Sequence, residues 1–279
     1  MTNRMENAVI RKVFLLVALI LVLPGSALAQ KEHSSMLLKE SSLVIRDSIA
    51  SFDYKAGGEK VEGLLHGPAV TYTYHDPYYP LMARGEFEIL FGSTDFKRDG
   101  GSSDSDDIII NVRGLLGYDI LYHDNLVLTP YTGLGMRYWH NNVSGARDQS
   151  QTYYYIPVGV ESVSSLMPTV DFGVRLEADY VFNGSANTEF NGDQGRNGEA
   201  VNDLDFGYGL RASVYISKQF EAVGVGFEPF VRYWNVEGSD GDWVHRPGYG
   251  AGGATQNFEN FSTQRGETLI WGASLSVHF

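Results

Sequence analysis

The sequence predicts an all-β fold, an up-and-down antiparallel transmembrane β-barrel of eight strands. Three observations support this prediction. The chain begins with an export signal, eight later segments alternate apolar and polar residues, and the connections between those segments are short and long in turn. A barrel of ten strands is the alternative, in which residues 42–54 and 67–76 add one hairpin and keep the strand number even.

Composition excludes several classes of protein. The 279 residues include no cysteine, which rules out a disulfide scaffold, thiol catalysis and a zinc-cysteine site. Acidic side chains number 34 against 21 basic ones, and the net charge is -13. Nucleic acid is therefore not an expected partner, because phosphate binding depends on an excess of Lys and Arg. No cofactor or metal site is predicted.

Residues 1–29 have the three parts of a signal peptide. A basic start is followed by an apolar run at residues 13–23, which is shorter than the ~20 residues that a membrane-spanning helix needs. The small residues Ala27 and Ala29 then mark a cleavage site before Gln30. The mature chain is expected to start there, with a net charge of about -15.

The alternating segments each have one face without charge. In the last of them, the odd-numbered residues from 269 to 279 are all apolar, and the even-numbered ones are polar or glycine apart from Ile270. The eight apolar faces together offer about fifty positions and contain no Asp, Glu, Lys or Arg, where chance would place about ten. The segments are residues 81–92, 108–122, 126–139, 153–162, 169–182, 203–216, 222–235 and 268–279.

The opposite faces contain ten acidic residues and six arginines, which are predicted to line the barrel lumen. An eight-stranded barrel is only wide enough inside to be filled by side chains, so mutual ion pairing is the expected arrangement. A path for protons or small ions is the alternative. The predicted lumen charges are Arg84, Glu86, Glu88, Arg113, Asp119, Arg137, Glu161, Asp171, Arg175, Glu177, Asp179, Asp203, Asp205, Arg211, Glu228 and Arg232.

Connection lengths separate a membrane barrel from a soluble β-sandwich, which has the same alternation. Short connections are expected at residues 123–125, 163–168 and 217–221, and long ones at 93–107, 140–152, 183–202 and 236–267. Tight turns at one end and long loops at the other are typical of outer-membrane barrels, with the turns in the periplasm. Residues 81–279 are therefore assigned to the barrel, and residues 30–80 to a periplasmic lead-in or to the extra hairpin.

A series of strand motifs in matching order resembles the small eight-stranded bacterial outer-membrane β-barrels, over residues 72–279. The motifs are Tyr74-His75-Asp76-Pro77 with Gly85, residues 130–138, 155–161, 207–211 and 228–234, and the terminal Phe279. Asp76 replaces the family's usual Glu, and residues 259–263 depart from its usual entry to the last strand. The resemblance implies an outer-membrane location, contact with lipid and lipopolysaccharide, and recognition of Phe279 by the barrel assembly machinery. It implies no reaction.

The preferred function is a non-enzymatic barrel with a filled lumen that displays four outer loops for surface contact or envelope integrity. The surface ligand is not predicted. A narrow channel is the first alternative. The second is an enzyme at the barrel rim that acts on lipid A or peptides, for which a histidine base needs an acidic partner. Candidates are His140 and His245, with Asp95, Asp203 and Asp240.

Two acidic clusters in the predicted loops have the oxygen chemistry of a calcium or magnesium site. They are Asp104, Asp106 and Asp107, followed by Asp240 and Asp242. Their spacing does not match a defined calcium loop, so solvated surface charge is the expected role.

Overall fold

The computed structural model describes residues 39–98, 100–122, 125–144, 147–191, 197–204, 206–238, 242–250, 253–261 and 264–279. The predicted cleavage site, Asp205 and Asp240 lie outside these ranges. For residues 242–250 and 253–261 the backbone is described without side chains. None of the described residues forms a helix long and apolar enough to cross a membrane.

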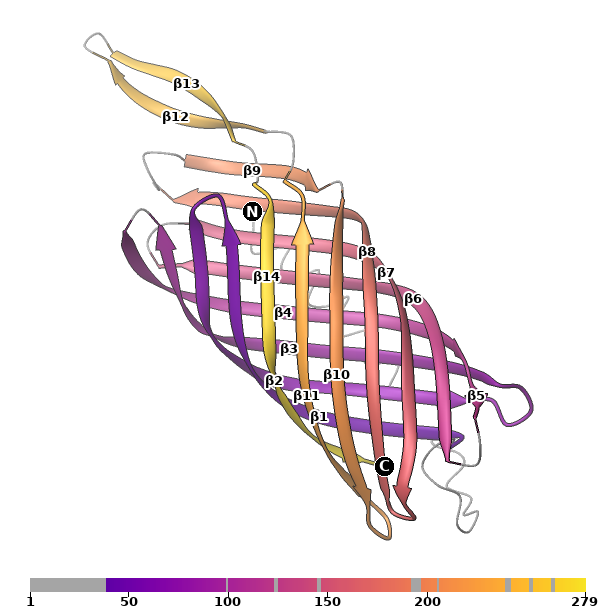
Figure 1. Ribbon diagram of the computed structural model, residues 1–279. Coiled ribbons are helices and arrows are strands. Elements are labelled where there is room, and N and C mark those ends of the chain that lie inside the picture. The colour runs from indigo at the N-terminus through magenta and orange to yellow at the C-terminus, as the bar shows by residue number, and fades with distance from the viewer. Residues whose placement is uncertain are drawn as a thin grey trace. The chain divides into compact units, whose positions relative to one another are not determined.

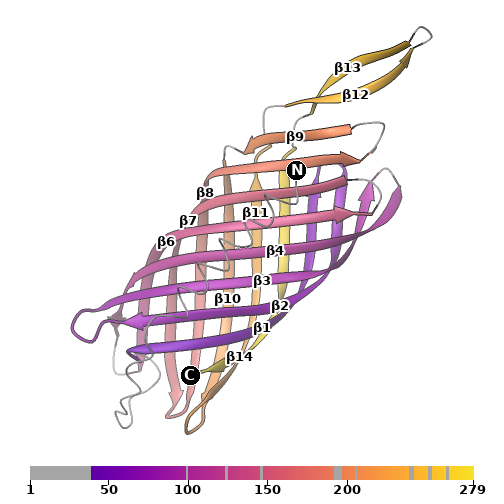
Figure 2. The same cartoon turned by 180° about the vertical axis from the view of Figure 1, so that it is seen from behind.

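Ten antiparallel strands form a closed wall, in which neighbouring strands run side by side (Figures 1 and 2). Pairing of β1 with β14 closes it, from Val44 with His278 to Ala56 with Gly266. The ten-strand alternative is therefore confirmed, and the prediction of eight strands is wrong. The wall strands are β1 (Ser41–Ala56), β2 (Glu59–His75), β3 (Leu81–Arg98), β4 (Gly101–Tyr118), β6 (Leu126–Val143), β7 (Arg147–Met167), β8 (Val170–Asn191), β10 (Gly207–Gln219), β11 (Gly224–Val236) and β14 (Gly266–His278).

Four further strands lie outside this ring. The short β5 (Ile120–Leu121) pairs with β6 at one end of the barrel. At the other end, β9 (Asn197–Leu204) pairs with the distal part of β8. β12 (Asp242–Gly250) and β13 (Gly253–Phe261) form a hairpin, which pairs with β9 at His245 and Asn197.

β1 and β2 belong to the wall and are not a lead-in segment. Gly57 and Gly58 connect them in a two-residue turn with φ angles of 55° and 86°, a geometry that favours glycine. Their inward faces carry buried apolar residues such as Phe52 and Leu65. The same inward faces carry polar residues such as Ser48 and Thr71, so the two strands have a mixed inward face and lack the clear charge alternation of the other strands.

Both described chain ends lie at the same end of the barrel, called here the inner end. There the backbone N–H of Phe279 donates to the carbonyl of Leu43 at 2.9 Å, and the Leu43 N–H donates back at 3.3 Å. Four connections join strands at the inner end, and five join them at the outer end, two of which contain β9 and the β12–β13 hairpin. The expected number of four outer loops was too low because it omitted the β1–β2 turn.

Most of the predicted long loops are continuations of the strands. Residues 93–107, for example, continue β3 and β4 as a regular ladder that pairs Ser93 with Asp106 and Arg98 with Gly101. Polar residues occupy both faces of these extensions, so they lack the amphipathic signal of the inner segments. Among the described residues, the outer end is consequently built mainly from β-structure.

The wall has an apolar outer surface between its inner end and these extensions. On β14, Trp271 and Leu275 are 58% and 68% exposed, whereas Ile270 and Ser274 point inward and are buried. On β4, Leu116 is exposed and Arg113 is buried. We call this apolar outer surface of the wall the outer band.

A β-bulge next to Tyr155 shifts the register of β7 and β8, after which Ala186 and Thr188 point inward.

Candidate functional site

Polar and charged side chains gather in the lumen among the described residues. They form layers along the barrel, as the inward face of β3 shows. From the inner end outward, β3 contributes Arg84, Glu86 and Glu88, then the apolar Leu90, then the polar Thr94. Each of these residues meets side chains from other strands at the same level. The lumen is therefore a stack of charged, apolar and polar layers.

A single chain of alternating charges runs through the inner layers. Arg84 and Arg175 both contact Glu161, at 2.7 Å and 3.0 Å. Arg175 also reaches Glu86 at 3.4 Å, and Arg113 contacts that same carboxylate at 2.7 Å. Each carboxylate therefore bridges two guanidinium groups from different strands.

The chain continues across the lumen through Glu177, whose carboxylate is enclosed. Arg113 contacts it at 2.5 Å and Arg211 at 3.2 Å, and the Tyr131 hydroxyl donates to it at 2.8 Å. Arg211 then contacts Asp179 at 2.9 Å. The eight linked residues come from β3, β4, β7, β8 and β10, so the network ties opposite sides of the wall together. The planar guanidinium group suits this bridging because it offers five donors.

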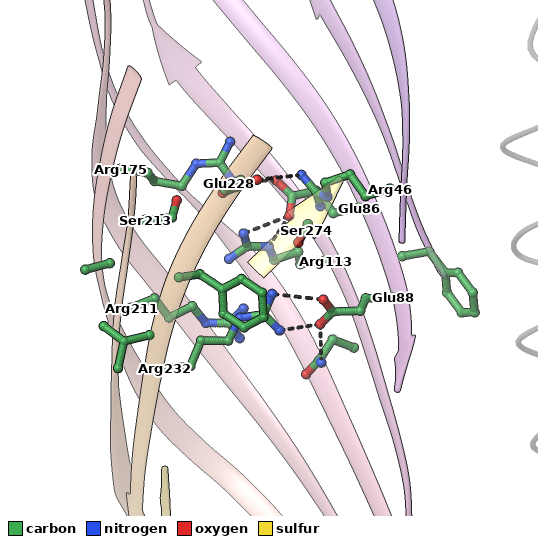
Figure 3. Close-up of a pocket in the computed structure, with 15 residues that line it drawn as sticks. Arg46, Glu86, Glu88, Arg113, Arg175, Arg211, Ser213, Glu228, Arg232 and Ser274 are labelled. Atoms are coloured by element: carbon green, nitrogen blue, oxygen red, sulfur yellow. Dashed lines mark hydrogen bonds and ion pairs between the residues drawn. The ribbon is translucent and has the colours of Figure 1, made fainter. Parts of the chain in front are cut away.

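Two further pairs complete the charged region (Figure 3). Arg232 of β11 binds Glu88 through both terminal nitrogens, and Asn111 donates to the same carboxylate at 2.9 Å. Arg46 of β1 lies 3.6 Å from Glu228. Arg46 was not among the predicted lumen charges, because the lead-in prediction removed its strand from the count.

A cavity with an open volume of about 40 Å³ lies among these pairs. Arg46, Arg113, Arg175, Arg211 and Arg232 line it together with Glu86, Glu88 and Glu228. That volume holds only a few water molecules or one small ion.

A cluster of buried apolar side chains, called here the plug, lies in the lumen on the outer side of the charges. Its side chains are less than a tenth exposed and come from β1, β2, β3, β4, β6, β11 and β14. They are Ala50, Phe52, Tyr54, Val61, Leu65, Leu90, Phe96, Ile109, Trp139, Val143, Phe230 and Ile270. The ring of Trp139 packs on Tyr54 with centroids 4.4 Å apart. The plug was not predicted, although the alternation of Ala50, Phe52 and Tyr54 was a usable signal.

Polar groups close the outer mouth above and beside the plug. Asp107 accepts hydrogen bonds from Thr94, from Trp139 Nε1 at 2.5 Å and from Asn141 at 3.1 Å. Glu59 of β2 pairs with Arg147 of β7 and with Arg98 of β3, the latter at 3.3 Å. The rings and ion pairs of the mouth therefore join strands that are distant in the wall.

Several predicted lumen charges have other surroundings. Asp119 is bound by His75 at 2.6 Å and by the Thr129 hydroxyl at 2.7 Å, at the inner end. Asp171 accepts from Ser165 at 2.9 Å and contacts no arginine among the described residues. Asp203 is exposed on β9, which lies outside the ring, and the chain joins the ring again only at Gly207. Arg137 lies in the lumen but forms no ion pair with any described side chain.

The described members of the candidate rim and cation sites are dispersed, and the side chains of Asp242 and His245 lie outside the described part of the chain. His140 points out of the wall and stacks with Tyr138, their ring planes 2° apart, and Asp95 lies on the outward face of β3. Asp104 and Asp106 point outward while Asp107 points into the lumen, so the first acidic cluster is divided between two faces. Over the described part of the chain, no three His, Asp or Glu side chains converge as metal ligands would.

Comparison with solved structures decides the class of the fold. The barrel is similar to the outer membrane protease OmpT of Escherichia coli, with a TM-score of 0.60 and 10% sequence identity over 89% of this chain and 99% of that one. The fold is that of an outer-membrane β-barrel. The apolar outer band is consistent with this class, since it supplies a lipid-facing surface.

Weaker similarities are to other outer-membrane proteins. The translocator domain of autotransporter NalP from Neisseria meningitidis has a TM-score of 0.46 at 10% identity, with 89% of this chain and 90% of that chain covered. The attachment invasion locus protein Ail of Yersinia pestis has a TM-score of 0.32 at 11% identity, with 86% and 100% covered. No protein-family model and no curated protein matches the sequence.

Proposed function

We propose that this protein is a non-conducting outer-membrane barrel that presents its β-structured outer end for contact at the cell surface. The filled lumen carries the proposal. Charged layers, the apolar plug and the polar mouth lie one above another, and the cavity between the charged pairs has a volume of only about 40 Å³.

The construction of the outer end supports surface contact. Strands β3, β4, β6, β7 and β8 continue beyond the outer band, and β9 extends the sheet from β8. Ion pairs and buried rings brace this extension from within, as Arg147 and Glu59 do between β7 and β2. A rigid extension keeps its exposed residues in a fixed arrangement, which favours specific recognition because little conformational entropy is lost on binding.

Conductance in planar bilayers tests the closed lumen. Refolded protein whose insertion is verified by heat-modifiable migration should give no stable single-channel current. A matched variant with Leu90→Gly and Ile109→Gly removes two plug side chains. If the charged layers alone let ions pass, this variant should show current events. A stable current from the unaltered protein contradicts the proposal.

Contact at the surface is tested by shortening the outer end. Replacing residues 237–265 with a short turn should leave folding intact, because β11 and β14 pair directly up to Val236 and Gly266. Cells that produce this variant should adhere to surfaces or to one another less than cells with the full-length barrel. Equal adhesion, or peptide or lipid A cleavage by the purified barrel, favours a different function.

A further inference from the structure

Arg137 on β6 is a buried cation without an anion. Arg137 is 1% exposed, its Nη1 has no hydrogen-bond partner, and no ion pair joins it to the described residues. The other six lumen arginines each contact a carboxylate. These are Arg46, Arg84, Arg113, Arg175, Arg211 and Arg232. A buried guanidinium without an ion pair carries a large desolvation cost.

A second donor without an acceptor lies next to it. Trp234 of β11 is fully buried and its Nε1 has no hydrogen-bond partner among the described residues. The guanidinium carbon of Arg137 is 5.5 Å from the centre of the Trp234 ring, and that of Arg211 is 5.0 Å from it. The ring faces give the two cations a favourable π contact but leave the indole N–H unsatisfied.

None of the described carboxylates pairs with Arg137. Arg211 and Arg232 both repel it electrostatically, and their own carboxylates are engaged in the pairs described above. The other six lumen arginines pair with Glu86, Glu88, Glu161, Glu177, Asp179 and Glu228. Asp107 on the adjacent strand already accepts from Thr94, Trp139 and Asn141. The guanidinium of Arg137 is therefore buried without a carboxylate of its own among the described residues.

We propose that the lumen binds one small monovalent anion of the halide class, such as chloride, between the Arg137 guanidinium and the Trp234 indole N–H. Both groups only donate hydrogen bonds, so they complement a ligand that only accepts them. A charge of -1 matches the single charge of the Arg137 guanidinium. The cavity of about 40 Å³ lies in the neighbouring part of the lumen, where it is lined by Arg211, Arg232 and Asn111 but not by Arg137 or Trp234, and Asn111 is the direct cross-strand partner of Arg137.

Because the site is enclosed, the anion is expected to enter during folding. The test therefore refolds the denatured full chain into detergent micelles in gluconate, in chloride or in bromide, at constant ionic strength. Crystals of the bromide-refolded protein should show one anomalous peak within contact distance of Arg137 and Trp234. A water molecule or no density at that position in these crystals overturns the proposal.

Thermal unfolding supplies an independent measurement in solution. The midpoint of the unaltered barrel should rise as chloride replaces gluconate from 0 to about 150 mM, because a ligand that binds only the folded state stabilises it. Arg137→Met should remove this dependence, and Trp234→Phe should shift it to higher chloride while keeping the ring. Arg84→Met, a lumen arginine paired with Glu161, is the matched control and should retain it. An equal response in the unaltered barrel and in Arg137→Met overturns the proposal, and the bromide peak decides the matter if that variant does not fold.

Discussion

The ring of Tyr155 on β7 lies directly against Gly135 on β6, so closely that a Cβ on the glycine would come within 2.2 Å of the ring. The neighbouring contact is reciprocal, because Tyr131 of β6 lies against Gly159 of β7 in the same way. Both tyrosines are buried and bind network charges, Arg211 and Glu177 respectively. Glycines on the inward faces thus make room for the rings that hold the ion pairs in place.

Gly135→Ala should destabilise the barrel by about 1 to 3 kcal/mol, the usual range for overpacking a filled interior. Tyr155 has no free space to move into, and moving it breaks its 2.9 Å hydrogen bond with Arg211. Urea unfolding in detergent measures the loss. Gly114→Ala on β4 is the control, because a Cβ there meets nothing within 4 Å. Equal stability of the two variants contradicts this contact.

Glu177→Gln should destabilise the barrel by about 3 to 5 kcal/mol, because the change leaves two buried guanidinium groups short of a partner. Glu177 is the shared acceptor of Arg113 and Arg211. The comparison is Glu62→Gln in an exposed cluster with Lys60 and Lys97, outside the outer band, where solvent screens the charges and a much smaller loss of stability is expected. A small effect of Glu177→Gln indicates that water reaches the network.

The same exposed cluster predicts a flat pH response above about pH 5. Hydrogen bonds from Lys60 and Lys97 lower the pKa of Glu62 from 4.5 to about 2. A lowered pKa stabilises the folded state above the unfolded value, and that contribution is lost only as the pH falls through the folded value. Between about pH 5 and 8, the unfolding midpoints of the unaltered barrel and of Glu62→Gln should therefore change with pH by the same amount. A divergence in that range contradicts the lowered pKa of Glu62, because it requires a folded-state pKa that is raised above the unfolded value.

Single cysteines test the inward and outward faces, since the chain has none of its own. Leu275→Cys should react with a lipid-soluble maleimide in the folded barrel, and Ser274→Cys should not. Leu275 is 68% exposed on the outer band, and the neighbouring Ser274 is buried beside Ser48. The reverse pattern of labelling means that β14 is displaced by one residue relative to its neighbours.

Deletion of Phe279 should reduce the amount of folded barrel in the outer membrane. Its backbone closes the wall through two hydrogen bonds with Leu43, and its ring ends the outward apolar row of β14. Heat-modifiable migration of the membrane fraction measures the folded amount. Phe279→Tyr keeps an aromatic end and should assemble as the unaltered chain does. Normal assembly after the deletion shows that the terminal residue is dispensable.

Local sequence determined the all-β class and the faces of most inner strands. Alternation along a strand fixes which side chains share a face, so the sequence by itself was sufficient to assign Arg113 and Glu177 to the lumen. The turn glycines Gly57 and Gly58 also mark a hairpin. Alternation did not identify β1 and β2, because the prediction expected charged residues on the inward face. Several inward residues of these two strands instead pack in the plug.

Tertiary structure decided which charges meet and which do not. Arg175 pairs with Glu86 and Glu161, not with Glu177 on its own strand, because the strand register and the closure of the wall set which residues lie at the same level of the lumen. The same geometry leaves Arg137 without a carboxylate and places Trp234 beside it. Each strand carries its own alternation, but the level at which side chains from distant strands meet depends on how all ten strands are staggered around the barrel.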